Sequence, residues 1–221
     1  MELRAAEADA DHLFANVVAR NLIRPGRTEL EVSDDIKALA KETLGITRYW
    51  HKRIVRSGKN TLEPYSSNPP NLVIADDDIV FLDFGPVFVE WEADFGRTYV
   101  VGDDPAKQAL AAELPKVWNI GKTWFDTSPE ATGEQLYAVV KAASEAAGYE
   151  FGHVMAGHLI GEFPHEHVED DKRFSYITPG NTRLMRERDP LGRQLHWILE
   201  VHLIDRAGQF GGFFEQLLTV D

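Results

Sequence analysis

The chain has 221 residues, 43% hydrophobic and 27% charged, so it can bury a sizeable core and has the composition of a globular protein. It contains no cysteine, which excludes disulfides, zinc–thiolate sites and a cysteine nucleophile. Its formal net charge of −13 argues against a nucleic-acid partner or an anionic membrane surface, because both bind basic patches.

The N-terminal stretch has no apolar h-region typical of a signal peptide, and no apolar run approaches the roughly 18 residues that span a membrane. Together with the lack of cysteine, this leads us to expect a cytoplasmic protein without a membrane partner. A homodimer is left open.

Two helices are predicted first along the chain. Apolar residues recur at helical spacing from about 6 to 22. Thr28 and Glu31 have the spacing of a capping box, which predicts a second helix through Leu44. Residues 46–70 contain several prolines and are expected to be irregular.

The later elements repeat this order of helices followed by strands. They are predicted as antiparallel strands 79–82, 87–89 and 98–101, helices 106–124 and 132–147, and strands near 197–204 and 213–220. Two helices followed by strands, occurring twice, indicate a duplicated α+β domain.

Acidic residues interrupt segments that otherwise have the pattern of buried strands. Asp83 follows four apolar residues in IVFLDFG, Glu200 lies in HWILEVHLID and Glu215 lies in FFEQLLTV. Asp94 follows at the start of the next strand pair. Any one of them could lie on the wet face of a half-exposed strand. Since a buried carboxylate is costly unless paired or metal-bound, the joint pattern favours a metal site.

The segment AGHLIGEFPHEH adds two histidines, His158 and His165. Gly157 and Gly161 bracket His158, which suits close approach of the backbone to a site. A lone histidine is more often a surface or satisfied core residue, and His165 could be a loop histidine ordered by its acidic neighbour. The glycines favour His158 as a ligand.

Four carboxylates and one neutral imidazole carry four negative charges, which two divalent cations would balance. Two ions about 3.5–4 Å apart can activate a water molecule for attack on an amide carbonyl. An oxygen-rich donor set with one nitrogen suits manganese, iron(II), cobalt or zinc, and the sequence does not rank them.

The order Asp, Asp, His, Glu, Glu resembles the metal ligands of the pita-bread metallopeptidases, which include methionine aminopeptidases, prolidases and aminopeptidases P. GHLIGEFPHE is similar to the family's GHGIG…HE segment, and RPGRTELEV is similar to the helix–turn–helix that opens its catalytic domain. The resemblance covers nearly the whole chain. It implies one α+β catalytic domain over 1–221, with pseudo-twofold duplication, a curved, mainly antiparallel sheet and helices on its outer face.

The resemblance also implies roles for individual residues. The implied metal ligands are Asp83, Asp94, His158, Glu200 and Glu215. Asp94 and Glu215 would bridge the two ions. Glu200 would also act as the general base, and His165 would donate a hydrogen bond to the substrate carbonyl and its oxyanion.

Two positions depart from the prolidase-like pattern. Pro64 stands where those members carry a substrate-facing histidine, and Phe213 stands where they carry an arginine before the last glutamate. His51 could take the vacant histidine role. The LDFG sequence at Asp83 is nevertheless more similar to the prolidase and aminopeptidase P branch than to the methionine branch.

The function implied is a dinuclear metal-dependent exopeptidase acting on a dipeptide or short peptide near its N-terminus, similar to a small Xaa-Pro dipeptidase or aminopeptidase. A methionine-aminopeptidase-like enzyme is the alternative exopeptidase. A non-catalytic binding protein of the same fold and a metal-free hydrolase of a small amidino compound are the other classes. The complete ligand set argues against both.

Overall fold

The computed structural model describes residues 2–162 and 172–219. Its helices are α1 (Glu2–Ala19), α2 (Glu29–Leu44), α3 (Pro105–Thr127) and α4 (Gly133–Ala146), with short 3-10 helices η1 (Gly58–Leu62) and η2 (Lys172–Ser175). Its strands are β1 (Ile54–Ser57), β2 (Asp78–Phe84), β3 (Val87–Phe88), β4 (Trp91–Glu92), β5 (Phe95–Val101), β6 (Glu150–Phe151), β7 (Leu159–Ile160), β8 (His196–Asp205) and β9 (Phe210–Leu217). Within the described ranges, none of the helices combines the length and apolarity needed to cross a bilayer.

The start of α2 is set by the predicted capping box. Thr28 Oγ1 accepts from the backbone N–H of Glu31 at 3.2 Å, and the Glu31 carboxylate accepts from the backbone N–H of Thr28 at 2.8 Å. Gly45 ends the helix in a left-handed conformation with φ of 69°. The first helix, α1, begins and ends earlier than predicted, at Glu2 and Ala19.

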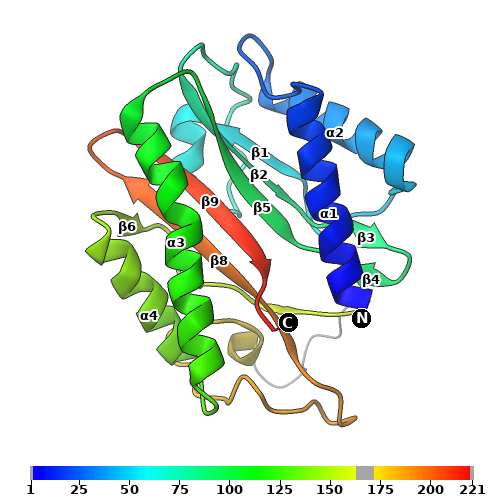
Figure 1. Cartoon of the computed structure of the whole chain (residues 1–221), viewed down its shortest axis with the longest axis vertical. Coiled ribbons are helices and arrows are strands. Elements are labelled where there is room, and N and C mark those ends of the chain that lie inside the picture. Colours follow the sequence, from blue (N-terminus) through cyan, green and yellow to red (C-terminus); the bar gives the residue numbers. More distant parts are fainter. Residues whose placement is uncertain (1, 163–171, 220–221) are drawn as a thin grey trace.

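The main sheet is antiparallel, with strand order β1-β2-β5-β9-β8-β6 and β7 paired to β8. The order is symmetric about the β5–β9 pair, because each half of the chain contributes two helices and then three of these strands. This confirms the predicted duplication. Figure 1 shows the four α-helices along one face of the sheet.

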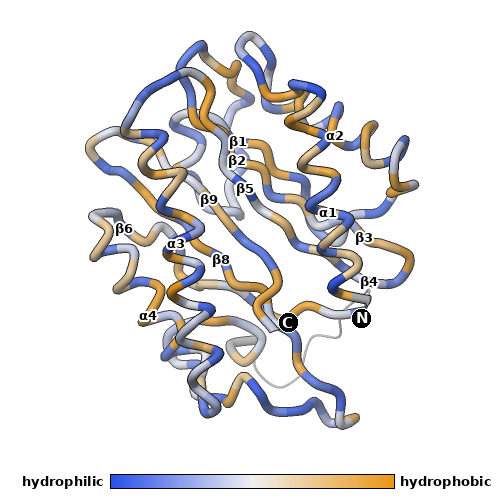
Figure 2. The backbone as a smooth tube through the Cα atoms, viewed as in Figure 1, coloured by the Kyte–Doolittle hydropathy of each residue, from blue (hydrophilic) through white to orange (hydrophobic). Residues whose placement is uncertain are grey.

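Alternation along the strands separates two faces of the sheet. Leu82 of β2 packs in the cluster that contains α1 and α2, and Leu199 and Val201 of β8 pack in the cluster that contains α3 and α4. Asp83 and Glu200 are their sequence neighbours and face a cavity on the opposite side. In Figure 2 hydrophobic residues concentrate on the strands and on the helix faces toward them.

Two sequence predictions are wrong. Residues 46–70 are not irregular throughout, since β1 pairs with β2 from Ile54 opposite Asp83 to Ser57 opposite Val80. All four residues of β1 are buried, so the strand shows no alternation.

The segment 87–89 does not form part of a three-stranded unit with β2 and β5. Instead β3 pairs with β4 in a separate two-stranded sheet. Pro86, which has no N–H to donate to a ladder, lies where the chain leaves the main sheet.

Candidate metal centre

The predicted ligands converge on the sheet face opposite the helices. They lie on three strands and in two segments that lead into strands, namely Asp83 on β2, Glu200 on β8, Glu215 on β9, Asp94 before β5 and His158 before β7. All five line one cavity of about 420 Å³. The structure therefore brings together every residue that the sequence analysis assigned to the metals.

Strand pairing places three of these carboxylates side by side. Glu200 lies directly opposite Glu215, and Gly96 lies opposite both Asp83 and Glu215 on its neighbouring strands. A Cβ at residue 96 would lie 2.6 Å from the ring of Phe213 and 3.0 Å from Cγ of Glu215. Glycine at this position therefore leaves room for the Glu215 side chain in the cavity.

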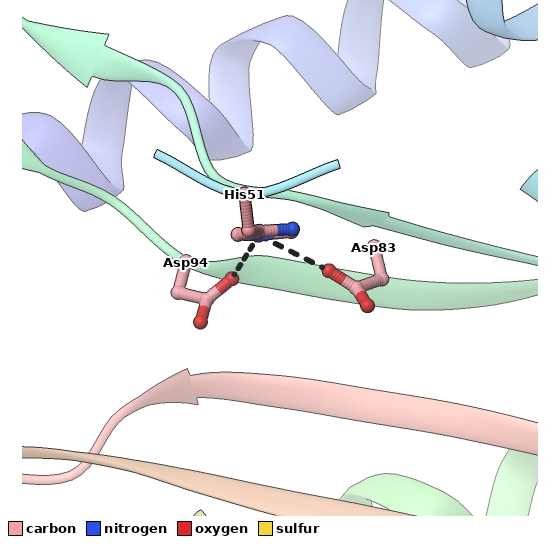
Figure 3. A group of neighbouring side chains, drawn as sticks. All are labelled: His51, Asp83 and Asp94. Carbon is pink, nitrogen blue, oxygen red and sulfur yellow. Dashed lines mark hydrogen bonds and ion pairs between the residues drawn. The ribbon is translucent and has the colours of Figure 1, made fainter. Parts of the chain in front are cut away.

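Two histidines contact opposite oxygens of Asp94. His158 Nε2 lies 3.0 Å from Oδ2 of Asp94 and 3.5 Å from Oε1 of Glu200. His51 Nε2 lies 3.1 Å from Oδ1 of Asp94 and 3.4 Å from Oδ1 of Asp83. Figure 3 shows the His51 ring directed at both aspartates. From the sequence, His51 was a candidate only for a substrate-facing role, and these contacts were not predicted.

Crowding of buried carboxylates is visible in their pKa values. Burial, with the nearby charges of Asp94 and Asp83, raises the pKa of Glu215 well above its ordinary value. Burial also raises the pKa of Glu200, and raises that of Asp83 to about 6. Among the described residues, buried Oε1 of Glu215 has no hydrogen-bond partner. Divalent cations would relieve this repulsion and supply that missing partner, so the residues fit a metal site.

Asp94 and the two histidines are shifted toward their charged forms, unlike the carboxylates of Asp83, Glu200 and Glu215. Burial alone would raise the pKa of Asp94, but His51 and His158 lower it to about 2. Burial alone would lower the pKa of each imidazole, but Asp83 and Asp94 raise that of His51, and Asp94 and Glu200 raise that of His158, each to about 9. Without metal, both imidazoles are therefore protonated at neutral pH around an ionised Asp94.

These shifts predict how the stability of the metal-free protein depends on pH. A pKa that is higher in the folded state favours folding below the unfolded-state pKa, and this contribution is lost as pH rises through the folded value. His51 and His158 follow this rule, and the raised carboxylate pKa values act in the same direction. We therefore expect the free energy of unfolding in EDTA to fall between about pH 6.5 and pH 9.

Urea unfolding at several pH values measures this slope. Divalent ions bind deprotonated ligands, so their stabilising effect should grow over the same window. A metal-free protein that becomes more stable from pH 6.5 to pH 9 would contradict the assigned electrostatics.

The backbone before His158 depends on glycine. Gly157 has φ of +128°, and a Cβ there would lie 2.0 Å from the carbonyl oxygen of Ile198. The backbone N–H of Ile198 donates to the His158 carbonyl at 2.9 Å, which ties this segment to β8. Glycine at residue 157 therefore lets the backbone before His158 approach that of β8 closely.

We expect Gly157→Ala to destabilise the protein more than Gly148→Ala. Both glycines have positive φ, so alanine at either position introduces about 1–3 kcal/mol of backbone strain. A Cβ at residue 148 meets nothing within 4 Å, whereas one at residue 157 collides with a carbonyl. The free energies of unfolding of the two variants in urea measure the effect of the collision. Equal losses of stability in both variants would contradict it.

The two departures from the prolidase-like pattern lie at or near the cavity. The centroid of the Phe213 ring lies 5.5 Å from the ring centroid of Phe81 and 6.2 Å from the ring centroid of His202. All three side chains line the cavity. The carbonyl of Pro64 accepts from Nη2 of Arg56 at 2.9 Å. His165, the predicted oxyanion donor, lies outside the described residues, and its role stays a prediction.

Comparison with known sequences places the chain among metal-dependent peptidases, which agrees with the geometry of the cavity. The model of Metallopeptidase family M24 matches residues 2–217. An Xaa-Pro dipeptidase of Lactobacillus helveticus is 29% identical over 188 residues, covering 84% of this chain and 48% of the relative. An Xaa-Pro dipeptidase of Lactobacillus delbrueckii subsp. lactis is 26% identical over 193 residues, covering 85% of this chain and 48% of the relative. The chain thus spans about half the length of these relatives.

Solved structures establish the fold. The X-Pro aminopeptidase of Thermotoga maritima matches with a TM-score of 0.77 and 21% identity, over 99% of this chain and 60% of that chain. The Xaa-Pro dipeptidase of Bacillus anthracis matches with a TM-score of 0.74 and 23% identity, over 99% of this chain and 59% of that chain. The predicted pita-bread architecture, a curved, mainly antiparallel sheet with helices on its outer face, is confirmed. With a family match from residue 2 to residue 217, the chain belongs to Metallopeptidase family M24.

Proposed function

We propose that the chain acts as a dinuclear metal-dependent exopeptidase on short peptides. The observation that carries the proposal is the convergence of four buried carboxylates and one imidazole in a single cavity. Membership of a metallopeptidase family supports it, and the two Lactobacillus relatives are named Xaa-Pro dipeptidases.

The residues proposed to hold the two ions are Asp83, Asp94, His158, Glu200 and Glu215. Asp94 is proposed as one bridge because one of its oxygens contacts His51 and the other contacts His158. Glu215 is proposed as the other, because it lies opposite Glu200 in the sheet and its Oε1 lacks a partner among the described residues. Manganese, cobalt, iron and zinc are the candidate metals. When bound, such ions would lower the pKa of a water and polarise the scissile carbonyl.

Glu200 is the proposed general base. Its carboxylate is buried in the cavity among the proposed metal ligands, so it would lie beside a water bound there. It would accept a proton from the attacking water and pass that proton to the departing amine. His158 Nε2 lies 3.5 Å from its Oε1, so the two side chains are placed to bind the same ion.

His165 is the proposed donor to the substrate carbonyl. We expect His165→Ala to lower turnover by about 10²–10³-fold, the range for losing one oxyanion donor. Metal content should stay near that of the wild type, because His165 is not an assigned ligand. Initial rates and elemental analysis of the same sample measure both effects. Loss of metal together with activity would make His165 a ligand instead.

The proposed substrate is a dipeptide or short peptide with a free N-terminal amine. The buried carboxylates and the net charge of −13 attract a cationic amine. Cleavage before proline is the preferred specificity, in line with the names of the two relatives. Pro64 and Phe213 depart from the prolidase-like pattern, so methionine-aminopeptidase-like specificity is the alternative.

A peptide panel tests this function. Metal-reconstituted protein is assayed on Xaa-Pro dipeptides, on Met-Ala-type peptides and on N-acetylated controls. We expect cleavage of free-amine peptides, with Xaa-Pro substrates preferred, and no cleavage of acetylated ones. Equal cleavage of the acetylated controls would exclude amine recognition. No cleavage of any free peptide with both ions bound would favour a binding protein or a non-peptide substrate.

A further inference from the structure

His51 is a buried imidazole in the metal cavity that the assigned ligand set does not use. Its side chain is 6% exposed, and Nε2 lies 3.1 Å from Asp94 and 3.4 Å from Asp83. One candidate ligand atom from each of these three residues lies within 4.8 Å of the other two (Figure 3). The three side chains therefore form a compact donor group of one nitrogen and two oxygens.

His51 and His158 are held in the same way. Nδ1 of His51 lies 2.7 Å from the carbonyl oxygen of Lys52, and Nδ1 of His158 lies 2.7 Å from that of Leu159. Because a carbonyl can only accept, each Nδ1 carries a proton and each Nε2 is left facing carboxylates. Donation of the far ring nitrogen to a backbone carbonyl is the usual way to orient a metal-binding histidine.

The contacts on the two sides of Asp94 match. Oδ1 of Asp94 faces His51, and Oδ2 faces His158. A second carboxylate adjoins each imidazole, with Asp83 at 3.4 Å from His51 and Glu200 at 3.5 Å from His158. Asp83 and Glu200 belong to β2 and β8, which occupy equivalent places in the two halves of the sheet. The cavity thus has two similar donor groups that share Asp94.

Packing fixes the His51 ring in this position. The backbone N–H of Trp50 donates to the Gly85 carbonyl at 3.0 Å, and its indole N–H donates to the Ala93 carbonyl at 2.9 Å. A Cβ at residue 85 would lie 2.2 Å from Cδ2 and 2.5 Å from Nε2 of His51. The segments next to Asp83 and Asp94 therefore anchor Trp50, the neighbour of His51. The glycine at residue 85 leaves room for the His51 ring.

We propose that His51 is an additional metal ligand, binding through Nε2 the ion shared by Asp83 and Asp94. Each of the two ions then has one imidazole. This inference rests on the proposed dinuclear function and adds a ligand to it. A second nitrogen donor should raise the affinity of that position for cobalt and zinc relative to manganese.

Proton NMR of the cobalt(II)-loaded protein tests the assignment. High-spin cobalt(II) shifts the N–H proton of a coordinated imidazole far outside the normal range, as a resonance that exchanges with solvent. We expect two such resonances in the wild type, from Nδ1–H of His51 and of His158. His51→Ala should lose one and His158→Ala the other. Cobalt affinity at one position of His51→Ala should fall by more than the 10–100-fold seen on losing an outer-shell partner.

Two further variants sharpen the result. His202 also lines the cavity and is buried, but its Nε2 lies 2.8 Å from the Thr61 carbonyl, so His202→Ala should keep both resonances. Gly85→Ala crowds the His51 ring without removing it and should weaken cobalt binding at one position by about 10-fold or more.

The wild-type spectrum decides the question even if a variant fails to fold. Two bound cobalt ions with only one shifted N–H resonance would overturn the ligand role of His51. The proposed metallopeptidase function would survive that result, with His51 contacting substrate or orienting Asp94. A wild type that binds no divalent ion in calorimetry would overturn both proposals.

Discussion

Asp94→Asn is expected to remove both metal ions and to lower peptide hydrolysis by about 10³-fold or more. The Asp94 carboxylate faces His51 with one oxygen and His158 with the other, so it is placed to serve both ions. Asparagine is uncharged and has a single acceptor oxygen, so it cannot bridge two cations. Metal ions supply several kcal/mol of transition-state stabilisation, and each 1.36 kcal/mol is tenfold in rate.

Elemental analysis after dialysis, with kcat/KM on the same sample, measures this effect. Asp78→Asn is the matched control, because Asp78 is a buried aspartate like Asp94 but lies at the start of β2 and accepts hydrogen bonds from the backbone N–H groups of Ala75 and Ile79. It should retain both ions. Full metal content in Asp94→Asn would show that the ligand assignment is wrong.

Glu200→Gln is expected to lower kcat by about 10²–10⁴-fold, the range for losing a positioned general base. Glutamine has the same shape as glutamate but cannot take a proton from the attacking water. Since Glu200 adjoins His158 and not His51, we expect weaker binding of one ion while the other is retained.

Measuring kcat against metal concentration separates the two roles of Glu200. At saturating metal, the second ion should return while kcat stays low, because the base is still missing. Recovery of wild-type kcat under these conditions would mean that Glu200 serves only as a ligand.

The fold was predictable where the signal is local in the sequence. The capping box of Thr28 and Glu31 marks the start of α2, and the long apolar run around Glu200 is typical of a buried strand, which is β8. The strand β1 was not predictable, because it is short, buried on both faces and contains Arg56. The Arg56 guanidinium is satisfied by backbone carbonyls from the following loop, a tertiary contact that leaves no sequence pattern.

The same distinction between local sequence signals and tertiary contacts applies to the candidate site. Asp83, Glu200 and Glu215 each interrupt an apolar strand, so their burial could be inferred from neighbouring residues. His51 lies outside any strand and reaches Asp94 only because Trp50 is anchored to carbonyls of the 85–93 segment. Its place in the cavity depends on packing between segments far apart in the chain, which periodicity does not encode.

Anomalous scattering from crystals grown with manganese would locate the two proposed ions. We expect two peaks in the cavity, about 3.5–4 Å apart as in other dinuclear sites, both bound by Asp94 and Glu215. Asp83 should bind one ion, and His158 and Glu200 the other. A single peak, no peak, or peaks outside this cavity would show that these residues do not form a dinuclear metal site.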